Sequence, residues 1–157
     1  MDWRLLPGWR AADTLLLPAL QLLFTYAGDR ATGWLWLPYQ PPVTPWPPPF
    51  ADLGPWLLTD LERETGVAFT ACCFQAYRDG TGTGWHSDKN WGAQAILSLG
   101  VTRTFGLRRH GFAEEFVRLR HGDLLVMPPG FQDSWEHCVP VEDVPGERCS
   151  LVFRSGA

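Results

Sequence analysis

The stretch Gly84-Trp85-His86-Ser87-Asp88 (GWHSD) organises the second half of the chain. In an extended segment, side chains two positions apart point to the same side. The imidazole of His86 and the carboxylate of Asp88 are therefore expected to share a face. A third ligand from a distant strand would complete a set of two histidines and one carboxylate, which is typical of mononuclear non-haem iron sites.

The best candidate for the third ligand is His137, which lies in the strand-like segment Trp135-Glu136-His137. The remaining histidines, His110 and His121, stand beside glycines in segments that read as turns. A His-x-Asp pair alone is weak evidence, because many surface loops contain one. A third ligand from a distant strand strengthens the evidence for a metal site. Three ligands on one side of the metal would leave its other coordination positions open.

Composition places limits on the class of protein. The chain has 157 residues, 45% of them hydrophobic, with a net charge of −4 and a pI of about 5.5. It is long enough for one domain with one core. Its charge provides no global attraction to phosphate, so contact with a nucleic acid would require a local basic patch.

The same composition argues against a structural zinc site and against a membrane segment. The four cysteines form no CxxC pair, which suits a reducing compartment. The apolar run at 15–24 is interrupted by Pro18 and Gln21 and is too short to span a bilayer. We expect a soluble, monomeric, cytoplasmic protein with no membrane contact.

Helical patterns come first along the chain and strand patterns follow. An irregular lead-in (1–13) precedes a predicted helix over 14–26, an aromatic strand over 33–39 and a second amphipathic helix over 51–65 that ends at Gly66. The proline-rich stretch 41–55 is interpreted as a rigid connector, with a polyproline ligand as the alternative. After a strand over 67–77 and a turn over 78–84, strands are predicted at 93–99, 102–107, 116–119, 123–127, 135–139 and 149–154.

This order predicts a mainly β fold with N-terminal helices, either a β-sandwich or a jelly roll. We expect a single domain over 1–157, in which 1–69 is helical support and 70–157 is the β core that carries the site.

A second pattern with period two lies at the C-terminus. Arg148 and Arg154 are six residues apart, so on one strand both would point to one face. Two inward guanidiniums need anionic partners, and a dicarboxylate suits their bidentate geometry. Gln75 and Tyr77 share a face of the strand before the His-x-Asp pair, and the Tyr77 hydroxyl could donate to the same anion. In the alternative, one arginine pairs with an internal acid, such as Asp123 or Asp133, and the other is exposed.

Several ordered motifs together resemble the AlkB-like family of Fe(II)- and 2-oxoglutarate-dependent dioxygenases, which act in alkylation repair. The resemblance covers 70–154, about half of the chain. It is carried by the segments 77–80 (YRDG), 84–88 (GWHSD), 98–100 (SLG), 103–105 (RTF), 121–127 (HGDLLVM), 135–137 (WEH) and 148–154.

The resemblance implies a double-stranded β-helix, the jelly roll of cupin-like proteins. It makes His86, Asp88 and His137 the ligands of Fe(II), with 2-oxoglutarate and O2 as cosubstrates. Arg148, Arg154 and Tyr77 would then lie around 2-oxoglutarate. Gln75 occupies a position where the family usually has asparagine, so its amide is retained on a side chain one methylene longer.

The family's substrate class is alkylated nucleic acid, and the resemblance implies oxidative removal of an alkyl group from a base nitrogen. Trp34, Trp36 and Tyr39 lie where relatives place a substrate lid. Five arginines suggest a phosphate track, with a solvated hairpin face as the alternative: Arg103, Arg108, Arg109, Arg118 and Arg120. A competing hypothesis is the same oxygenase chemistry on a protein side chain or small molecule. A third is a binding module that kept the fold without catalysis.

Overall fold

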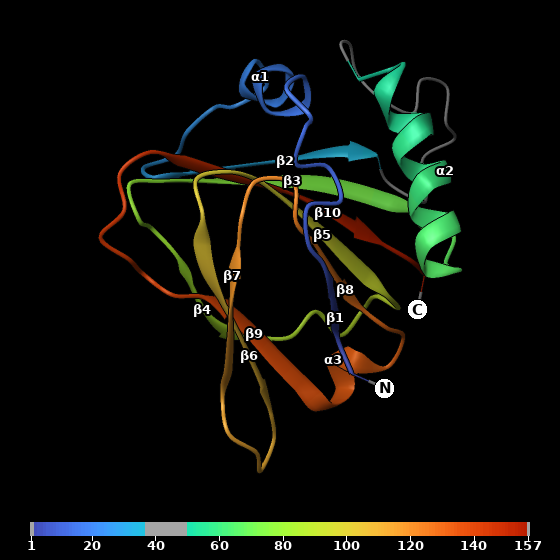
Figure 1. Cartoon of the computed structure of the whole chain (residues 1–157). Coiled ribbons are helices and arrows are strands. Elements are labelled where there is room, and N and C mark those ends of the chain that lie inside the picture. The colour runs from blue at the N-terminus through green and yellow to red at the C-terminus, as the bar shows by residue number, and fades with distance from the viewer. Residues whose placement is uncertain (1, 37–49, 157) are drawn as a thin grey trace.

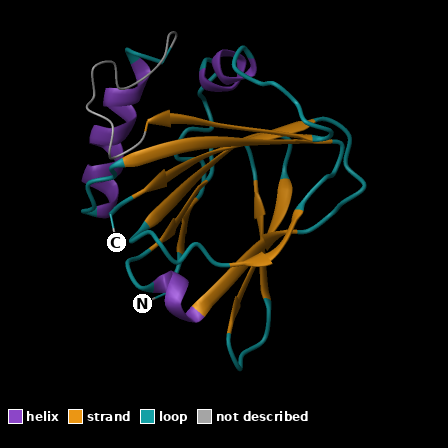
Figure 2. Cartoon of the chain, turned by 180° about the vertical axis from the view of Figure 1, so that it is seen from behind, coloured by secondary structure: helices purple, strands orange, loops and turns teal. Residues whose placement is uncertain are grey.

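The fold consists of two antiparallel β-sheets that face one another, with two helices on the outer side of the larger sheet (Figure 1; Figure 2). A computed structural model describes residues 2–36 and 50–156. The facing sheets form the jelly roll that the sequence predicts. Within the described part of the chain, none of the helices has the length and apolar character needed to cross a membrane.

The larger sheet has six strands in the order β1-β8-β5-β10-β3-β2. These strands are β1 (Arg4–Leu6), β8 (Leu124–Met127), β5 (Gln94–Gly100), β10 (Glu147–Arg154), β3 (Ala71–Arg78) and β2 (Arg30–Trp36). The smaller sheet has the order β4-β9-β6-β7, formed by β4 (Thr83–His86), β9 (Trp135–Val139), β6 (Arg103–Arg109) and β7 (Glu115–Leu119). The helices are α1 (Leu16–Gln21), α2 (Leu53–Thr65) and α3 (Phe131–Ser134).

Two apolar layers result from strand alternation in the larger sheet. Val152 of β10 belongs to the layer between the sheets, which it shares with Phe105 and Leu107 of β6. Its neighbour Leu151 faces the other way and joins the layer beneath the helices, which includes Leu61 of α2. Burying one such side chain contributes about 2 kcal/mol, so this alternation fixes which residues of β10 face the smaller sheet.

The second predicted helix is close to the observed one. It begins at Leu53 and ends at Thr65, and Gly66 follows with a φ of 72° and donates its backbone N–H to Glu62. A left-handed residue of this kind ends a helix at little cost only when it is glycine.

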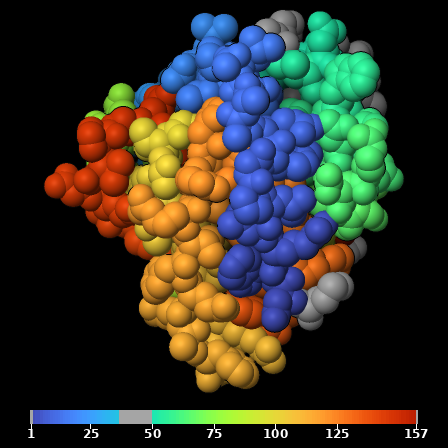
Figure 3. Space-filling view, in the orientation of Figure 1, coloured from blue at the N-terminus to red at the C-terminus, as the bar shows by residue number. Residues whose placement is uncertain are grey.

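Other boundaries differ from the prediction. The first helix stops at Gln21, and the chain then turns so that the Phe24 ring packs 5.3 Å from the Phe74 ring. The lead-in is not irregular throughout, because β1 pairs with β8. In the space-filling view the blue N-terminal residues form a band down the face that is shown, between the orange and the green parts (Figure 3). The predicted turn at 78–84 also ends early, because β4 starts at Thr83.

Candidate metal and cosubstrate site

Two histidines meet where β4 and β9 pair in the smaller sheet. His86 is the last residue of β4, and it lies opposite His137 of β9 with 4.3 Å between the ring centroids. The Nδ1 atom of His86 is 2.9 Å from the carbonyl oxygen of Gly84. When Nδ1 carries the proton it donates to that carbonyl, which leaves Nε2 as a lone-pair donor for a metal.

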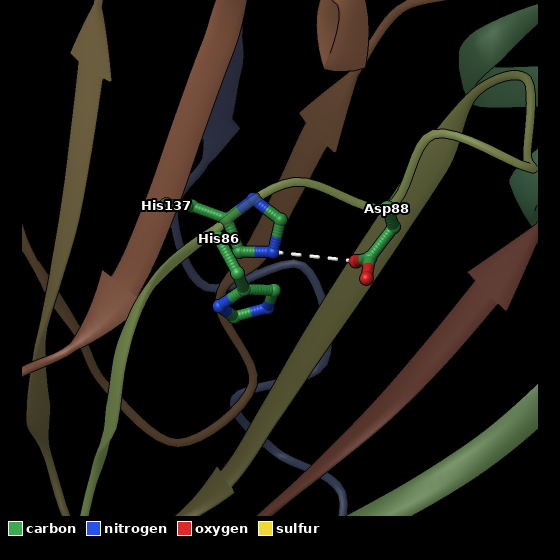
Figure 4. A group of neighbouring side chains, drawn as sticks. All are labelled: His86, Asp88 and His137. Atoms are coloured by element: carbon green, nitrogen blue, oxygen red, sulfur yellow. Dashed lines mark ion pairs between the residues drawn. The ribbon is translucent and has the colours of Figure 1, made fainter.

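Asp88 completes the group, although strand alternation does not place it there. β4 ends at His86, so Asp88 lies in the following loop. Its backbone N–H donates to the side chain of Gln132 in α3, and its Oδ2 accepts from Gln94 at 3.1 Å. That Oδ2 lies 3.4 Å from Nε2 of His137, the contact drawn in Figure 4. Hydrogen bonds of Asp88 with Gln132 and Gln94, and not strand alternation, therefore hold its carboxylate beside the two histidines.

The protonation states suit ligands of a metal. Burial lowers the pKa of His137 below its usual value and outweighs the opposite influence of Asp88, so the imidazole is neutral at pH 7. Burial alone would raise the pKa of Asp88. The hydrogen bond with His137, the charge of the Arg154 guanidinium and the Gln94 amide outweigh it and hold that pKa well below its usual range.

The donor set fits a divalent iron ion. The potential ligand atoms of His86, Asp88 and His137 all lie within 4.8 Å of one another. Ligands at right angles around a metal are about 3 Å apart when each bond is about 2.1 Å. Two imidazoles and one carboxylate on one side leave the other coordination positions open. The buried Nδ1 of His137 has no hydrogen-bond partner among the described residues.

The larger sheet contributes the opposite wall of the same cavity. This cavity is lined by all seven residues that the sequence analysis placed in the metal and cosubstrate sites: His86, Asp88, His137, Gln75, Tyr77, Arg148 and Arg154. Two sites predicted from separate patterns therefore form one space between the sheets.

Arg148 is a buried cation without an acidic partner among the described residues. Its side chain is 1% exposed, and its Nε donates to Ser98 Oγ at 3.1 Å. Burial lowers the pKa of Arg148, yet a guanidinium stays charged in proteins. The Tyr77 ring lies beside it, with 5.8 Å from Arg148 Cζ to the ring centroid. Arg148 thus places a positive charge at a cavity, and no carboxylate of the described residues pairs with it.

Arg154 is held differently. One of its terminal nitrogens lies 3.9 Å from Asp88 Oδ2, and its Cζ is 5.6 Å and 5.4 Å from the ring centroids of Trp34 and Trp91. Its Nε is buried without a partner among the described residues. The alternative pairing with Asp123 does not form, because the Asp123 carboxylate accepts from the backbone of Gly8 and Arg120 instead.

The predicted substrate residues are only partly near this cavity. Trp34 is 46% exposed and contributes to a neighbouring cavity of about 350 Å³, which shares Gln75 and Arg154 with the first. Trp36 follows an irregularity in the pairing of β2 with β3. Tyr39 lies outside the described residues.

The structure separates the five arginines proposed as a phosphate track. Arg103 is 1% exposed, so it does not lie where a phosphate could reach it. Three of the other four face carboxylates: Arg108 pairs with Glu136 and Glu114, Arg118 with Glu142, and Arg120 with Asp123. Arg109 stacks on the exposed ring of Phe112. The cluster is therefore largely neutralised within the protein.

Several side chains that shape the site were not predicted from the sequence. Gln94 and Ser98 lie on β5 directly across from Arg154 and Ser150 of β10. Their signal was present, because two polar residues with even spacing interrupt an otherwise apolar strand. Trp91 and Gln132 carried no comparable signal, since each reaches the site from a loop or a short helix.

Comparisons with known proteins agree with this geometry. The sequence model of the 2OG-Fe(II) oxygenase superfamily matches residues 26–154, and the chain belongs to this superfamily. The α-ketoglutarate-dependent dioxygenase alkB homolog 3 of Rattus norvegicus is 35% identical over 151 residues, which covers 83% of this chain and 51% of the relative. The Homo sapiens protein of the same name is 32% identical over 155 residues and is covered to 53%. The resemblance to AlkB-like proteins is confirmed, and the chain spans about half the length of these curated relatives.

Solved structures share the fold at low sequence identity. An oxidoreductase of the 2OG-Fe(II) oxygenase family from Burkholderia pseudomallei superposes with a TM-score of 0.71 at 18% identity, covering 99% of this chain and 86% of that one. The structure of OsALKBH1 superposes with a TM-score of 0.67 at 17% identity, covering 98% of both chains.

Proposed function

We propose that this chain is an Fe(II)- and 2-oxoglutarate-dependent dioxygenase that removes alkyl groups from nitrogen atoms of nucleobases in DNA or RNA. The observation that carries the proposal is the position of Arg148, a buried cation without an acidic partner among the described residues. It lines the same cavity as His86, Asp88 and His137. A metal ligand set beside an uncompensated guanidinium suits a substrate that is both a chelator and an anion, as 2-oxoglutarate is.

Each residue has a definite task in this proposal. His86, Asp88 and His137 hold Fe(II) from one side, and Arg148 binds the carboxylate of 2-oxoglutarate that lies away from the metal. Bound Fe(II), with 2-oxoglutarate and O2, supplies the oxidation of a carbon attached to nitrogen, and the hydroxylated product releases an aldehyde.

The protein's other contribution is to keep the ligands in place. Gln94 and Gln132 fix the loop that carries Asp88, and the hydrogen bond with His137 together with the Arg154 guanidinium lowers the pKa of the Asp88 carboxyl. The Phe105 ring stacks on the His137 imidazole, with 5.7 Å between centroids and 12° between planes, which limits rotation of that ligand. The base would enter from the neighbouring cavity, where Trp34 offers an exposed aromatic face for stacking.

The direct test uses an oligonucleotide that carries methylated bases, together with Fe(II) and 2-oxoglutarate. The proposal predicts that the oligonucleotide loses the mass of a methyl group while succinate accumulates, and that His86→Ala abolishes both changes. Wild type and His86→Ala giving the same background of succinate would favour a non-catalytic binding module. If succinate accumulates but no oligonucleotide is demethylated, the nucleic-acid substrate is wrong, while the 2-oxoglutarate-dependent oxygenase chemistry is supported.

One observation favours the alternative, the same chemistry on a protein side chain or a small molecule. The arginines expected to follow a phosphate backbone are mostly paired with the protein's own carboxylates. Salt dependence separates the two. Binding to an alkylated single strand that weakens steeply as salt rises supports the nucleic acid, because phosphate contacts release counter-ions.

A further inference from the structure

A row of three side chains crosses the larger sheet at one end of the cavity. Arg30 of β2, Tyr77 of β3 and Arg148 of β10 are direct neighbours in the strand register. The Tyr77 ring lies between the two guanidiniums, 4.8 Å from Arg30 Cζ and 5.8 Å from Arg148 Cζ. Tyr77 is 2% exposed. The ring is therefore fixed by cation–π contacts on both sides, and only its hydroxyl hydrogen is free to reorient.

The hydroxyl of Tyr77 is already engaged on both of its sides. Arg30 Nη2 donates to the Tyr77 oxygen at 3.5 Å, and the Tyr77 hydroxyl donates to Gln75 Oε1 at 2.8 Å. A guanidinium has donors only, so the single hydroxyl hydrogen is directed to the Gln75 carbonyl. Tyr77 then has no second hydrogen to donate to an anion beside Arg148.

Gln75 is therefore placed to compete with the cosubstrate. We propose that Gln75 is a latch that occupies the Tyr77 hydroxyl, and that the carboxylate of 2-oxoglutarate must displace it to gain that donor. The inference rests on the proposed function, because it takes a dicarboxylate as the ligand of Arg148. Gln75 is then a positioning residue, and it lowers the affinity for cosubstrate that Arg148 and Tyr77 would otherwise provide.

The size of the effect follows from the hydrogen bond that is exchanged. An intramolecular hydrogen bond between neutral groups contributes about 0.5–1.5 kcal/mol net, so its removal should tighten binding of 2-oxoglutarate about fivefold. Gln75→Met keeps the length of the side chain and removes the acceptor. Gln75→Asn keeps the amide and withdraws it by one methylene, so it should act in the same direction.

The experiment is a calorimetric titration of 2-oxoglutarate into the Mn(II)-loaded protein, with no turnover involved. Four proteins form a cycle: wild type, Gln75→Met, Tyr77→Phe and the double variant. Gln75→Met should bind about fivefold more tightly than wild type. The same substitution should change nothing in the Tyr77→Phe background, because no hydroxyl remains to be released. Tighter binding by Gln75→Asn supports the latch if it too disappears in the Tyr77→Phe background, and a gain that persists there would mean that the asparagine amide contacts the anion directly.

Other outcomes overturn the latch in distinct ways. Weaker binding in Gln75→Met would mean that the amide itself contacts the anion. The latch would also be overturned if wild type and Gln75→Met bound 2-oxoglutarate with equal affinity. The same holds if Gln75→Met raised the affinity equally in the wild-type and the Tyr77→Phe backgrounds. Mn(II) affinity measured on each variant reports whether the cavity is intact. If wild type itself binds no 2-oxoglutarate, the proposed function fails, and that result is distinguishable from failure of the latch.

Discussion

The two sheets each bury one arginine, and the two arginines have opposite surroundings. Arg103 of the smaller sheet donates to the carbonyl oxygens of Gly80 at 3.1 Å and Pro140 at 2.8 Å, and its Nε lies 3.4 Å from Glu142. Arg148 of the larger sheet is equally buried, yet among the described residues its side chain donates a hydrogen bond only to the hydroxyl of Ser98.

The surroundings of the two arginines indicate different roles for them. A buried charge is stable when hydrogen bonds and an opposite charge replace water, as they do around Arg103. That arginine joins the loop at 140–142 to the turn at Gly80 and is part of the fold. Among the described residues Arg148 has no such acid, and it lines the same cavity as His86, Asp88 and His137. We therefore expect its counter-ion to be a bound ligand.

The largest expected effect is the loss of Arg103. Arg103→Met leaves the carbonyl groups of Gly80 and Pro140 without their donor, while Glu142 keeps Thr104 and Arg118. Each buried acceptor left without a partner costs about 1–3 kcal/mol, so the loss should be about 3 kcal/mol. Chemical denaturation should show that decrease in the free energy of unfolding. If the free energy of unfolding falls by less than about 1 kcal/mol, Arg103 does not stabilise the fold by joining the loop at 140–142 to the turn at Gly80.

Metal binding should stabilise the protein through the histidines and not through either arginine. A divalent ion at about 100 times its dissociation constant adds about 2.7 kcal/mol to the free energy of unfolding. Thermal unfolding with Mn(II) and with a chelator should show this difference in wild type and in Arg148→Met. His137→Ala should lose it. Stabilisation that persists in His137→Ala would place the ion elsewhere.

The Arg103 region should also respond to acid through Glu142. Burial alone would raise the pKa of Glu142, but the backbone N–H of Thr104 and the Arg118 guanidinium lower it below its usual value. A lowered pKa in the folded state means that the stabilisation is complete above the unfolded carboxyl pKa of about 4.3 and is lost as the pH falls through the folded value. Glu142→Gln should cost about 1 kcal/mol at pH 7 and progressively less towards pH 3. Denaturation curves at both pH values test this, and a constant difference would contradict it.

The smallest effect is expected for Arg148 in the ligand-free protein. Arg148→Met removes an uncompensated buried charge and retains most of the apolar stem, so the free energy of unfolding should change by less than about 1 kcal/mol. The same denaturation experiment that shows a large loss for Arg103→Met provides the comparison. A loss as large as that of Arg103→Met would mean that Arg148 is structural.

Strand periodicity explains how much of the site could be predicted from sequence. β10 is eight residues long and pairs on both sides, so alternation placed Arg148 and Arg154 on one face correctly. The same reasoning brought Gln75 and Tyr77 together on β3. These predictions depend on local geometry alone, which a sequence carries directly.

Contacts between distant segments could not be predicted in this way. Glu142 is 39 residues from Arg103, and nothing in either segment indicates that they meet. Asp88 does lie beside His86 as predicted, but strand alternation is not the cause. Gln132, 44 residues away, anchors the loop that carries Asp88. The pairing of β1 with β8 was missed because a strand of three residues has too few positions to show alternation.

We infer that Arg148 has no acidic partner among the described residues because it receives a carboxylate of 2-oxoglutarate beside the metal. The decisive experiment is an anaerobic titration of 2-oxoglutarate into the Fe(II)-loaded protein, followed by the visible charge-transfer absorption of the chelate. Loss of a charge-assisted, bidentate contact should weaken binding about 100-fold in Arg148→Met, with Fe(II) binding retained. Equal affinity in wild type and Arg148→Met would contradict the claim.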